Sequence, residues 1–195
     1  MAGEKTNSRK IQAEATKNKI YKTAIRLMEQ RGYSSMKIED ICTKAGVSVG
    51  SFYNYFKSKN DILIEIYKRA DIYFRETVHP NVVGKSAPEN IVDYFVYYAR
   101  YNEITGVETT KQLFASANKM YISKGRVMQA VLIDVLKRGQ ESGELTKEFE
   151  PEAMTEYLFI SARGVCYDWA SHDGSYDLQE KMRSYMKMLV KIFTN

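Results

Sequence analysis

The 195-residue sequence predicts an all-α protein with about nine helices in two domains. Apolar residues recur at spacings of three and four through most of the chain, which is the period of an α-helix. Few stretches show the alternation of β-branched residues that a half-buried strand requires. Only three prolines occur, and each can lie at the boundary of an element. Hydrophobic residues make up 44% of the chain, which is enough for a buried core and excludes wholesale disorder.

Three helices are predicted in a first domain of residues 1–60. The first has one apolar face over residues 20–28 and can end at Gly32. The second repeats this pattern over residues 38–45 and closes at Gly46. The third follows Ser48, which can cap it, and runs to Phe56.

Residues 61–195 are predicted to form a second, larger helical domain. Ser58 and Asp61 have the spacing of a capping box, which opens a connecting helix over residues 61–79. The stretch from His79 to Pro88 contains two prolines and a glycine and breaks this helix. The later helices are expected at about 89–103, in a shorter segment ending near 118, and at 123–141, 152–171 and 177–193.

Positive charge is concentrated in the first domain. Up to Asn60 the chain has 12 Lys and Arg against 5 Asp and Glu, a net charge of +7. The remainder has 17 against 19, a net charge of −2. A basic segment on a slightly acidic body indicates a nucleic-acid-binding module. Charge alone fits a lysine-rich solvated surface equally well.

The sequence also bears on the compartment in which the protein works. No apolar run approaches the ~18 residues that span a bilayer, and the first fifteen residues lack the apolar region of a secretory signal. Cys42 and Cys166 lie far apart and form no pair motif, which favours a reducing environment. We therefore expect a cytoplasmic protein with no membrane partner.

Residues 37–56 have the character of a helix-turn-helix. Ala45-Gly46-Val47-Ser48 connects two short helices, and a glycine there lets the chain leave the first helix in a left-handed conformation. The second helix starts with small or polar residues, which lets its N-terminus approach phosphates and base edges. An ordinary αα-hairpin is the alternative.

The string VSVGSFYNYFKSKNDIL, residues 47–63, resembles the DNA-binding signature of the TetR family of tetracycline-repressor-like regulators. Gly32-Tyr33 and residues 38–41 are also similar to the first two helices of that family, and the close resemblance covers residues 16–64. It implies an N-terminal DNA-binding domain and a C-terminal effector-binding and dimerisation domain. The implied function is a dimeric regulator, usually a repressor, that leaves a palindromic operator when a small molecule binds.

The resemblance places the following residues at the DNA: Lys37, Ser48, Val49, Gly50, Ser51, Tyr53, Asn54, Tyr55 and Lys59. Hydroxyl, amide and ammonium groups suit phosphates and base edges, and Val49 suits a thymine methyl group. The family often has Ser or Thr at the position of Lys37. A lysine side chain cannot accept the hydrogen bond that caps a helix, but it can reach a phosphate. Phe52 and Phe56 are expected to pack inside the domain. The basic segment before residue 20 is either a further DNA contact or a flexible tail.

Two apolar stripes on the helix at 152–171 predict a dimer. A surface helix needs one stripe for its own core, so the second needs another partner, and a small residue at Gly164 permits close helix approach. The resemblance places the dimer seam of the family on the last two helices. The predicted interface residues are Tyr157, Ile160, Gly164, Tyr167, Met182, Tyr185 and Leu189. A helix buried deeply within one subunit is the alternative.

Aromatic and methionine side chains between these regions predict an effector site. Tyrosine combines an apolar ring with a polar tip, which suits a pocket for an apolar or aromatic molecule, although such stripes more often form core. The predicted ligand-binding residues are Tyr97, Tyr101, Phe114, Tyr121, Met128 and Trp169.

Three other classes of protein fit the sequence less well. An enzyme is disfavoured because only His79 and His172 are available, and no phosphate loop, paired-carboxylate motif or metal-ligand cluster occurs. We therefore expect neither a cofactor nor a metal. A thiol redox sensor would use Cys42 or Cys166, which both lie at apolar helical positions. A pure protein-interaction module would not need the string at residues 47–63.

Overall fold

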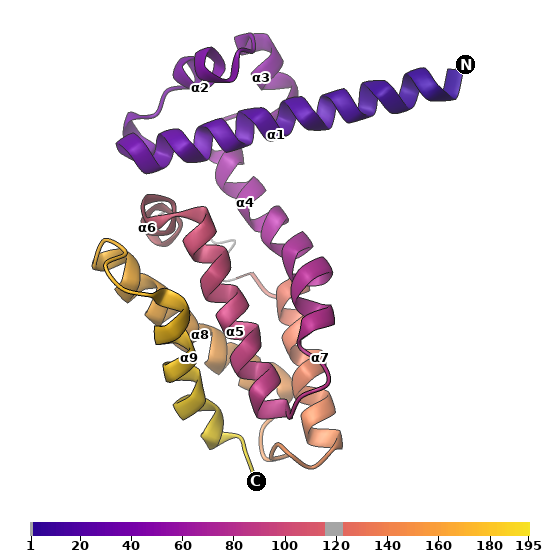
Figure 1. Cartoon of the computed structure of the whole chain (residues 1–195), viewed down its shortest axis with the longest axis vertical. Coiled ribbons are helices and arrows are strands. Elements are labelled where there is room, and N and C mark those ends of the chain that lie inside the picture. The colour runs from indigo at the N-terminus through magenta and orange to yellow at the C-terminus, as the bar shows by residue number, and fades with distance from the viewer. Residues whose placement is uncertain (1, 116–122) are drawn as a thin grey trace. The chain divides into compact units, whose positions relative to one another are not determined.

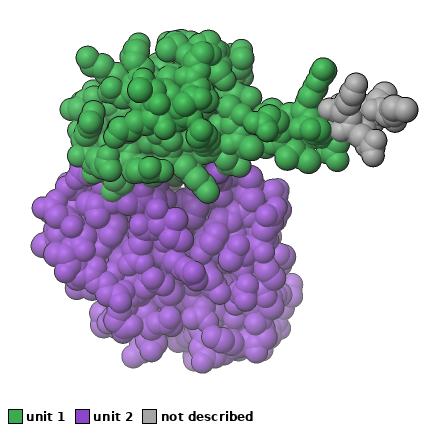
Figure 2. Space-filling view, turned by 45° about the horizontal axis from the view of Figure 1, so that its top comes forward, with its two compact units in different colours: residues 1–66 green, residues 67–195 purple. Residues whose placement is uncertain are grey.

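The computed structural model describes residues 2–115 and 123–195, which contain nine α-helices (Figure 1). These ranges contain no β-strand apart from an isolated bridge between Leu145 and Thr194, so the predicted all-α fold is confirmed. The chain divides into two compact units, residues 1–66 and 67–195, coloured separately in Figure 2. The boundary predicted at residue 60 falls at the start of α4, slightly before the limit of the first unit.

Unit 1 contains α1 (Ala2–Ser35), α2 (Ile38–Ala45), α3 (Val49–Tyr55) and the first part of α4 (Asn60–Tyr73). Gly32, the predicted end of the first helix, has φ 73° and ψ 159°, and α1 kinks there before a further short helical stretch. Residues 2–19 are helical, which corrects the alternative of a flexible tail for this stretch.

The core of unit 1 is made by the apolar faces that the spacing predicted. Its fully buried residues include Ile20, Ala24, Leu27, Met28, Ile41, Ala45, Phe52, Ile62 and Leu63. Phe52 and Phe56 are 0% and 2% exposed, with ring centroids 5.7 Å apart, so their predicted interior role is confirmed. Each buried phenylalanine contributes about 1.5–3 kcal/mol to stability, which makes α3 firmly anchored for a short helix.

In unit 2, α4 continues into a π-helical turn (Phe74–Val78) and a 3-10 turn (His79–Asn81). The remaining α-helices are α5 (Ala87–Thr105), α6 (Val107–Ala115), α7 (Val127–Glu141), α8 (Pro151–Ser171) and α9 (Leu178–Leu189). α5 packs between α7 and α9, and α8 packs against α6, α7 and α9 (Figure 1). The helix end expected near residue 118 lies outside the described residues. Helix α7 begins at Val127, a turn later than predicted.

An aromatic cluster forms the centre of unit 2. Tyr94 and Phe95 are fully buried, and the ring of Phe159 lies 5.5 Å from Phe95 and 5.7 Å from Tyr98. The Tyr94 hydroxyl donates to the Met128 carbonyl at 2.7 Å, and burial raises the pKa of Tyr94. Several of the tyrosines from 94 to 101 therefore serve the core.

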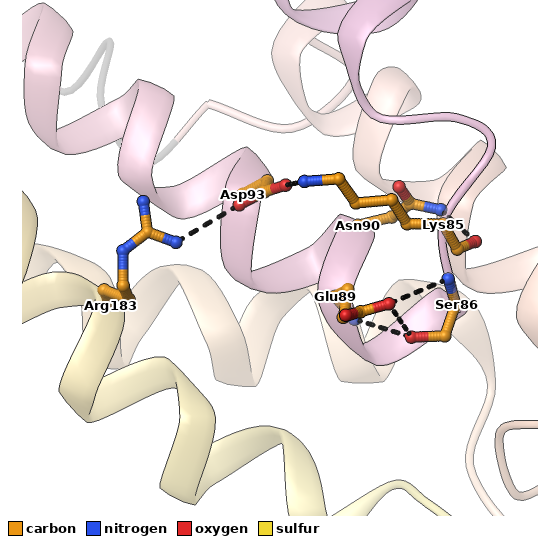
Figure 3. Close-up of polar contacts among 6 residues, drawn as sticks. All are labelled: Lys85, Ser86, Glu89, Asn90, Asp93 and Arg183. Carbon is orange, nitrogen blue, oxygen red and sulfur yellow. Dashed lines mark hydrogen bonds and ion pairs between the residues drawn. The ribbon is translucent and has the colours of Figure 1, made fainter.

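Polar contacts fix the start of α5 (Figure 3). Ser86 and Glu89 form a capping box, in which the Glu89 carboxylate accepts from the Ser86 N–H at 3.2 Å. The Ser86 hydroxyl and backbone N–H together lower the pKa of Glu89. Asp93 accepts from Lys85 at 2.6 Å and from Arg183 at 3.3 Å, and the second contact joins α5 to α9.

Candidate functional site

The turn between α2 and α3 is formed as the sequence predicted. Gly46 ends α2 in the left-handed region, with φ 62° and ψ 42°, and its N–H donates to the Thr43 carbonyl at 3.2 Å. Ser48 caps α3, because its Oγ accepts from the Ser51 N–H at 3.0 Å. These two residues set the direction in which α3 leaves the turn.

Four residues on two successive turns of α3 form its solvent-exposed outer face. Val49 is 41% and Tyr53 51% exposed, and Gly50 and Asn54 are exposed beside them. The buried Phe52 packs the opposite face of α3 into the core. Residues four apart, such as Val49 and Tyr53, lie on the same side of a helix, so they share the outer face. Ser51 and Tyr55, by contrast, are half-buried. The exposed surface combines an apolar contact, a hydroxyl and an amide, as a base-reading helix requires.

Lys59 has an intramolecular role that the sequence analysis missed. Its Nζ donates to the carbonyls of Tyr33 at 2.8 Å and Met36 at 3.0 Å, and it lies 4.4 Å from the centre of the Tyr33 ring. Carbonyls at the end of a helix lack intrahelical partners, and a cation there also suits the helix dipole. The ammonium predicted to neutralise a phosphate thus ties the end of α1 to the start of α4. Its only sequence signal is a lysine at a helix start, which is too common to identify the contact.

Other basic side chains of unit 1 divide between the interior and the surface. Lys17 forms an ion pair with Glu65 at 2.9 Å, so it supports the unit itself. Lys37 precedes α2 with no side-chain cap, as predicted, and its side chain is exposed. Lys44 and Lys57 are exposed as well. These exposed lysines place positive charge on the surface of unit 1.

The described members of the predicted ligand-binding set contact different neighbours. Tyr97 and Tyr101 pack against Tyr73, with ring centroids 6.5 and 5.2 Å away, whereas Phe114 contacts Tyr167 at 5.7 Å. Met128 is in the core. Trp169 is also buried, and its Nε1 donates to the Tyr176 carbonyl at 3.1 Å. Tyr121 lies outside the described residues.

A groove of about 570 Å³ lies between α7 and α8 in unit 2. Its wall includes Gln129, Ile133, Thr155, Phe159, Ile160 and Arg163. None of the predicted ligand-binding residues belongs to this wall. The spacing of Thr155 and Phe159, one turn apart on α8, could have marked this third face of the helix. Aromatic stripes alone do not reveal it, because Thr155 is not aromatic.

The second stripe of α8 is exposed along its whole length. Tyr157, Ile160 and Tyr167 are 49%, 58% and 58% exposed, and Gly164 lies between them. α9 adds Tyr185, at 44% exposed, and a neighbour that the sequence analysis missed, Met188, at 62%. The stripe therefore lacks a covering element within the described part of the chain.

One of the predicted interface residues on α9, Met182, needs correction. Met182 is fully buried, because it lies one turn from Leu178 and Met186 on the face that packs into unit 2. Leu189 is half-buried and packs against the same core. Met182 and Tyr185 are three residues apart, and this step crosses from the buried face of α9 to its exposed face.

A helix-turn-helix with an outward-facing third helix, joined to an all-helical body, defines a class of DNA-binding regulators. Residues 20–66 match the family of bacterial regulatory proteins described as the tetR family. The Transposon Tn10 TetC protein of Escherichia coli is 30% identical over 173 residues, which cover 87% of this chain and 83% of TetC. The fatty acid metabolism regulator protein of Bacillus subtilis (strain 168) is 24% identical over 179 residues, covering 88% of this chain and 92% of that protein.

The fold is also found among solved structures. The transcriptional regulator FadR from Bacillus subtilis in complex with stearoyl-CoA superposes with a TM-score of 0.75 at 22% identity, covering 88% of this chain and 96% of FadR. The chain belongs to the TetR family. It is accordingly a DNA-binding transcriptional regulator and not an enzyme.

The cysteines and the helices give two further findings. Cys42 and Cys166 are 3% and 0% exposed, and burial raises the pKa of both thiols, which disfavours the reactive thiolate. Across the described ranges, no helix has the length and apolarity needed to cross a membrane.

Proposed function

We propose that this chain is a homodimeric repressor that reads a palindromic operator through α3 and leaves it when a small apolar or aromatic effector binds unit 2. The observation that carries the DNA-reading part is the outer face of α3. Val49, Gly50, Tyr53 and Asn54 are exposed there, on a helix that the buried Phe52 anchors. A folded domain has no internal use for this combination of exposed side chains.

Dimerisation gives the proposed reading heads their spacing. Two heads separated by about 34–36 Å meet successive major grooves on one side of the duplex, which explains a palindromic site. The exposed stripe on α8 supports this assembly, because a second copy would cover it. Such a regulator would act in the cytoplasm, where bacterial DNA lies.

Effector control requires a difference in ligand affinity between two shapes of the dimer. Helix α4 is the proposed lever, since its residues belong to both compact units. A ligand that favours one position of the unit 2 end of α4 would change the separation of the two reading heads. The relative crystallised with stearoyl-CoA supports the existence of an effector without naming the one used here.

The DNA-binding proposal is tested by selecting sites from a random duplex library with the full-length protein. We expect enrichment of a palindrome. Lys37→Gln should weaken binding to selected and unrelated DNA alike and lower the slope of log affinity against log salt by about 1, because one phosphate contact is lost. Lys147→Gln, at an exposed lysine of unit 2, is the control and should leave both quantities unchanged.

Failure to enrich any sequence would reject the proposal as a whole. Enrichment of a palindrome with an unchanged salt slope in Lys37→Gln would reject only the assignment of Lys37.

A further inference from the structure

Thr155 carries a buried hydroxyl that the described part of the chain leaves unused. The residue is 4% exposed, and its Oγ1 has no hydrogen-bond partner among the described residues. A buried hydroxyl without a partner is unfavourable. The residue belongs to the wall of the groove between α7 and α8, so its side chain borders the space that a molecule in the groove would occupy.

Two other threonines make the hydrogen bond within their helix that Thr155 lacks. A threonine within a helix commonly donates its hydroxyl to the carbonyl four residues earlier. Thr105 does this to Tyr101 at 2.7 Å, and Thr110 does it to Gly106 at 2.8 Å. Thr155 makes no such bond, although it lies five residues into α8, where the carbonyl four residues earlier belongs to Pro151 of the same helix. Its hydroxyl is therefore available to a partner from outside the helix.

The groove beside Thr155 has an apolar wall. Phe159 lies one turn further along α8, is 6% exposed, and is held by edge-to-face contacts with Phe95 and Tyr98. Ile133 and Ile160 complete the apolar surface. A volume of about 570 Å³ is in the range of small-molecule sites. The wall thus suits an aromatic or aliphatic body that places one polar group at Thr155.

The charges around the groove limit the class of ligand. The wall contains the carboxylates of Glu150, Glu152 and Glu156 and the cations of Lys124 and Arg163. Two of these carboxylates are already paired, because Glu156 lies 3.8 Å from Lys124 and Glu152 lies 3.6 Å from Lys137. A molecule with several phosphate charges would meet no surplus of cations and would face these carboxylates, which is unfavourable.

We propose that the α7–α8 groove is the effector site and that it takes an uncharged aromatic or apolar molecule whose hydroxyl or carbonyl hydrogen-bonds to Thr155 Oγ1. This inference rests on the proposed function and assigns the ligand class of its sensor. Ile160 belongs both to the groove wall and to the exposed stripe of α8, so the ligand also contacts the helix that carries the proposed seam.

The experiment titrates the full-length protein with phenol, 4-phenylphenol and 2-naphthol, and with naphthalene and 2-naphthyl phosphate as matched probes. At least one of the three hydroxyl compounds should bind. Thr155→Val should weaken its binding about five- to tenfold, the worth of one neutral hydrogen bond, and Thr155→Ser should bind within about twofold of wild type. Naphthalene binding should be insensitive to Thr155→Val, and 2-naphthyl phosphate should bind at least about tenfold more weakly than 2-naphthol.

Thermal unfolding without ligand supplies a second readout. Thr155→Val removes the unpaired hydroxyl and should raise the Tm by about 2–4 °C. Thr105→Val is the matched control, because that hydroxyl is already bonded to Tyr101. It should not raise the Tm and should leave binding of the hydroxyl probe unchanged.

The inference is overturned if none of the three hydroxyl compounds binds, if Thr155→Val binds them as tightly as wild type, or if 2-naphthyl phosphate matches 2-naphthol. Operator selection with the unliganded protein is independent of these results. Intact operator binding together with any of them would reject the groove assignment and leave the DNA-binding proposal standing.

Discussion

At the scale of single residues, Lys59 could bind a DNA phosphate or the carbonyls at the end of α1, and the sequence does not distinguish these two roles. A lysine at a helix start beside a reading helix is expected to neutralise a phosphate. In the structure its ammonium is surrounded by carbonyls of the α1 terminus and by the Tyr33 ring. Hydrogen bonds from a charged donor contribute about 1.5–3 kcal/mol, so this contact is a substantial part of the stability of unit 1.

We therefore predict that Lys59→Met lowers the free energy of unfolding by about 1–3 kcal/mol, because the carbonyls of Tyr33 and Met36 lose their donor while the apolar stem is kept. Chemical denaturation followed by circular dichroism measures this. Lys57→Met, an exposed neighbour, should change stability by less than about 0.5 kcal/mol. Unchanged stability in Lys59→Met with a salt slope of DNA binding lower by about 1 would show that Lys59 serves DNA instead.

At the scale of elements, α3 contains a glycine that its own fold does not need. Gly50 is not in the left-handed region, and a Cβ added there would have Ser48 Oγ as its nearest neighbour at 3.9 Å. Glycine within a helix costs roughly 0.5–1 kcal/mol relative to alanine. A close approach of DNA to α3 explains why a residue without a side chain stands at position 50.

Gly50→Ala should accordingly raise the stability of the free protein by about 0.5 kcal/mol and weaken operator binding, since the added methyl group stands between α3 and the groove floor. Denaturation and operator titration measure the two effects. Gly46→Ala is the contrasting variant: its φ of +62° makes it lose about 1–2 kcal/mol of stability. Stabilisation of Gly50→Ala without any loss of operator affinity would remove Gly50 from the interface.

The helices also show how far the sequence determines the site. Apolar spacing predicted both faces of α8, because residues such as Leu158 and Tyr157 differ in burial as the helical period requires. The same reasoning failed on α9, where Met182 and Tyr185 share a spacing but not a face. Spacing on α8 could mark the face that carries Thr155 and Phe159, but not the missing hydrogen bond of Thr155, which depends on tertiary geometry.

At the scale of the whole molecule, the exposed stripe on α8 is unexplained by a single chain. Tyr157, Ile160 and Tyr167 are each about half exposed, at 49%, 58% and 58%. Gly164 lies among them, and a Cβ added there would meet nothing within 4 Å. One chain gains nothing from a glycine at this helical position, whereas two helices that cross here could approach closely.

Gly164→Arg should therefore keep the fold of each chain and prevent its pairing. The arginine has open space in the monomer and replaces a poor helix former, so helical content by circular dichroism should be unchanged. In the seam, by contrast, its volume and charge would be buried between two apolar faces without a partner.

Light scattering should report the 22.5 kDa chain for this variant and twice that mass for wild type. Operator affinity should fall at least about tenfold, because a single head reads only one half-site. Ala130→Arg, at an exposed position of α7 outside the stripe, should remain dimeric. A Gly164→Arg protein that stays dimeric and binds the operator normally would place the seam elsewhere on the molecule.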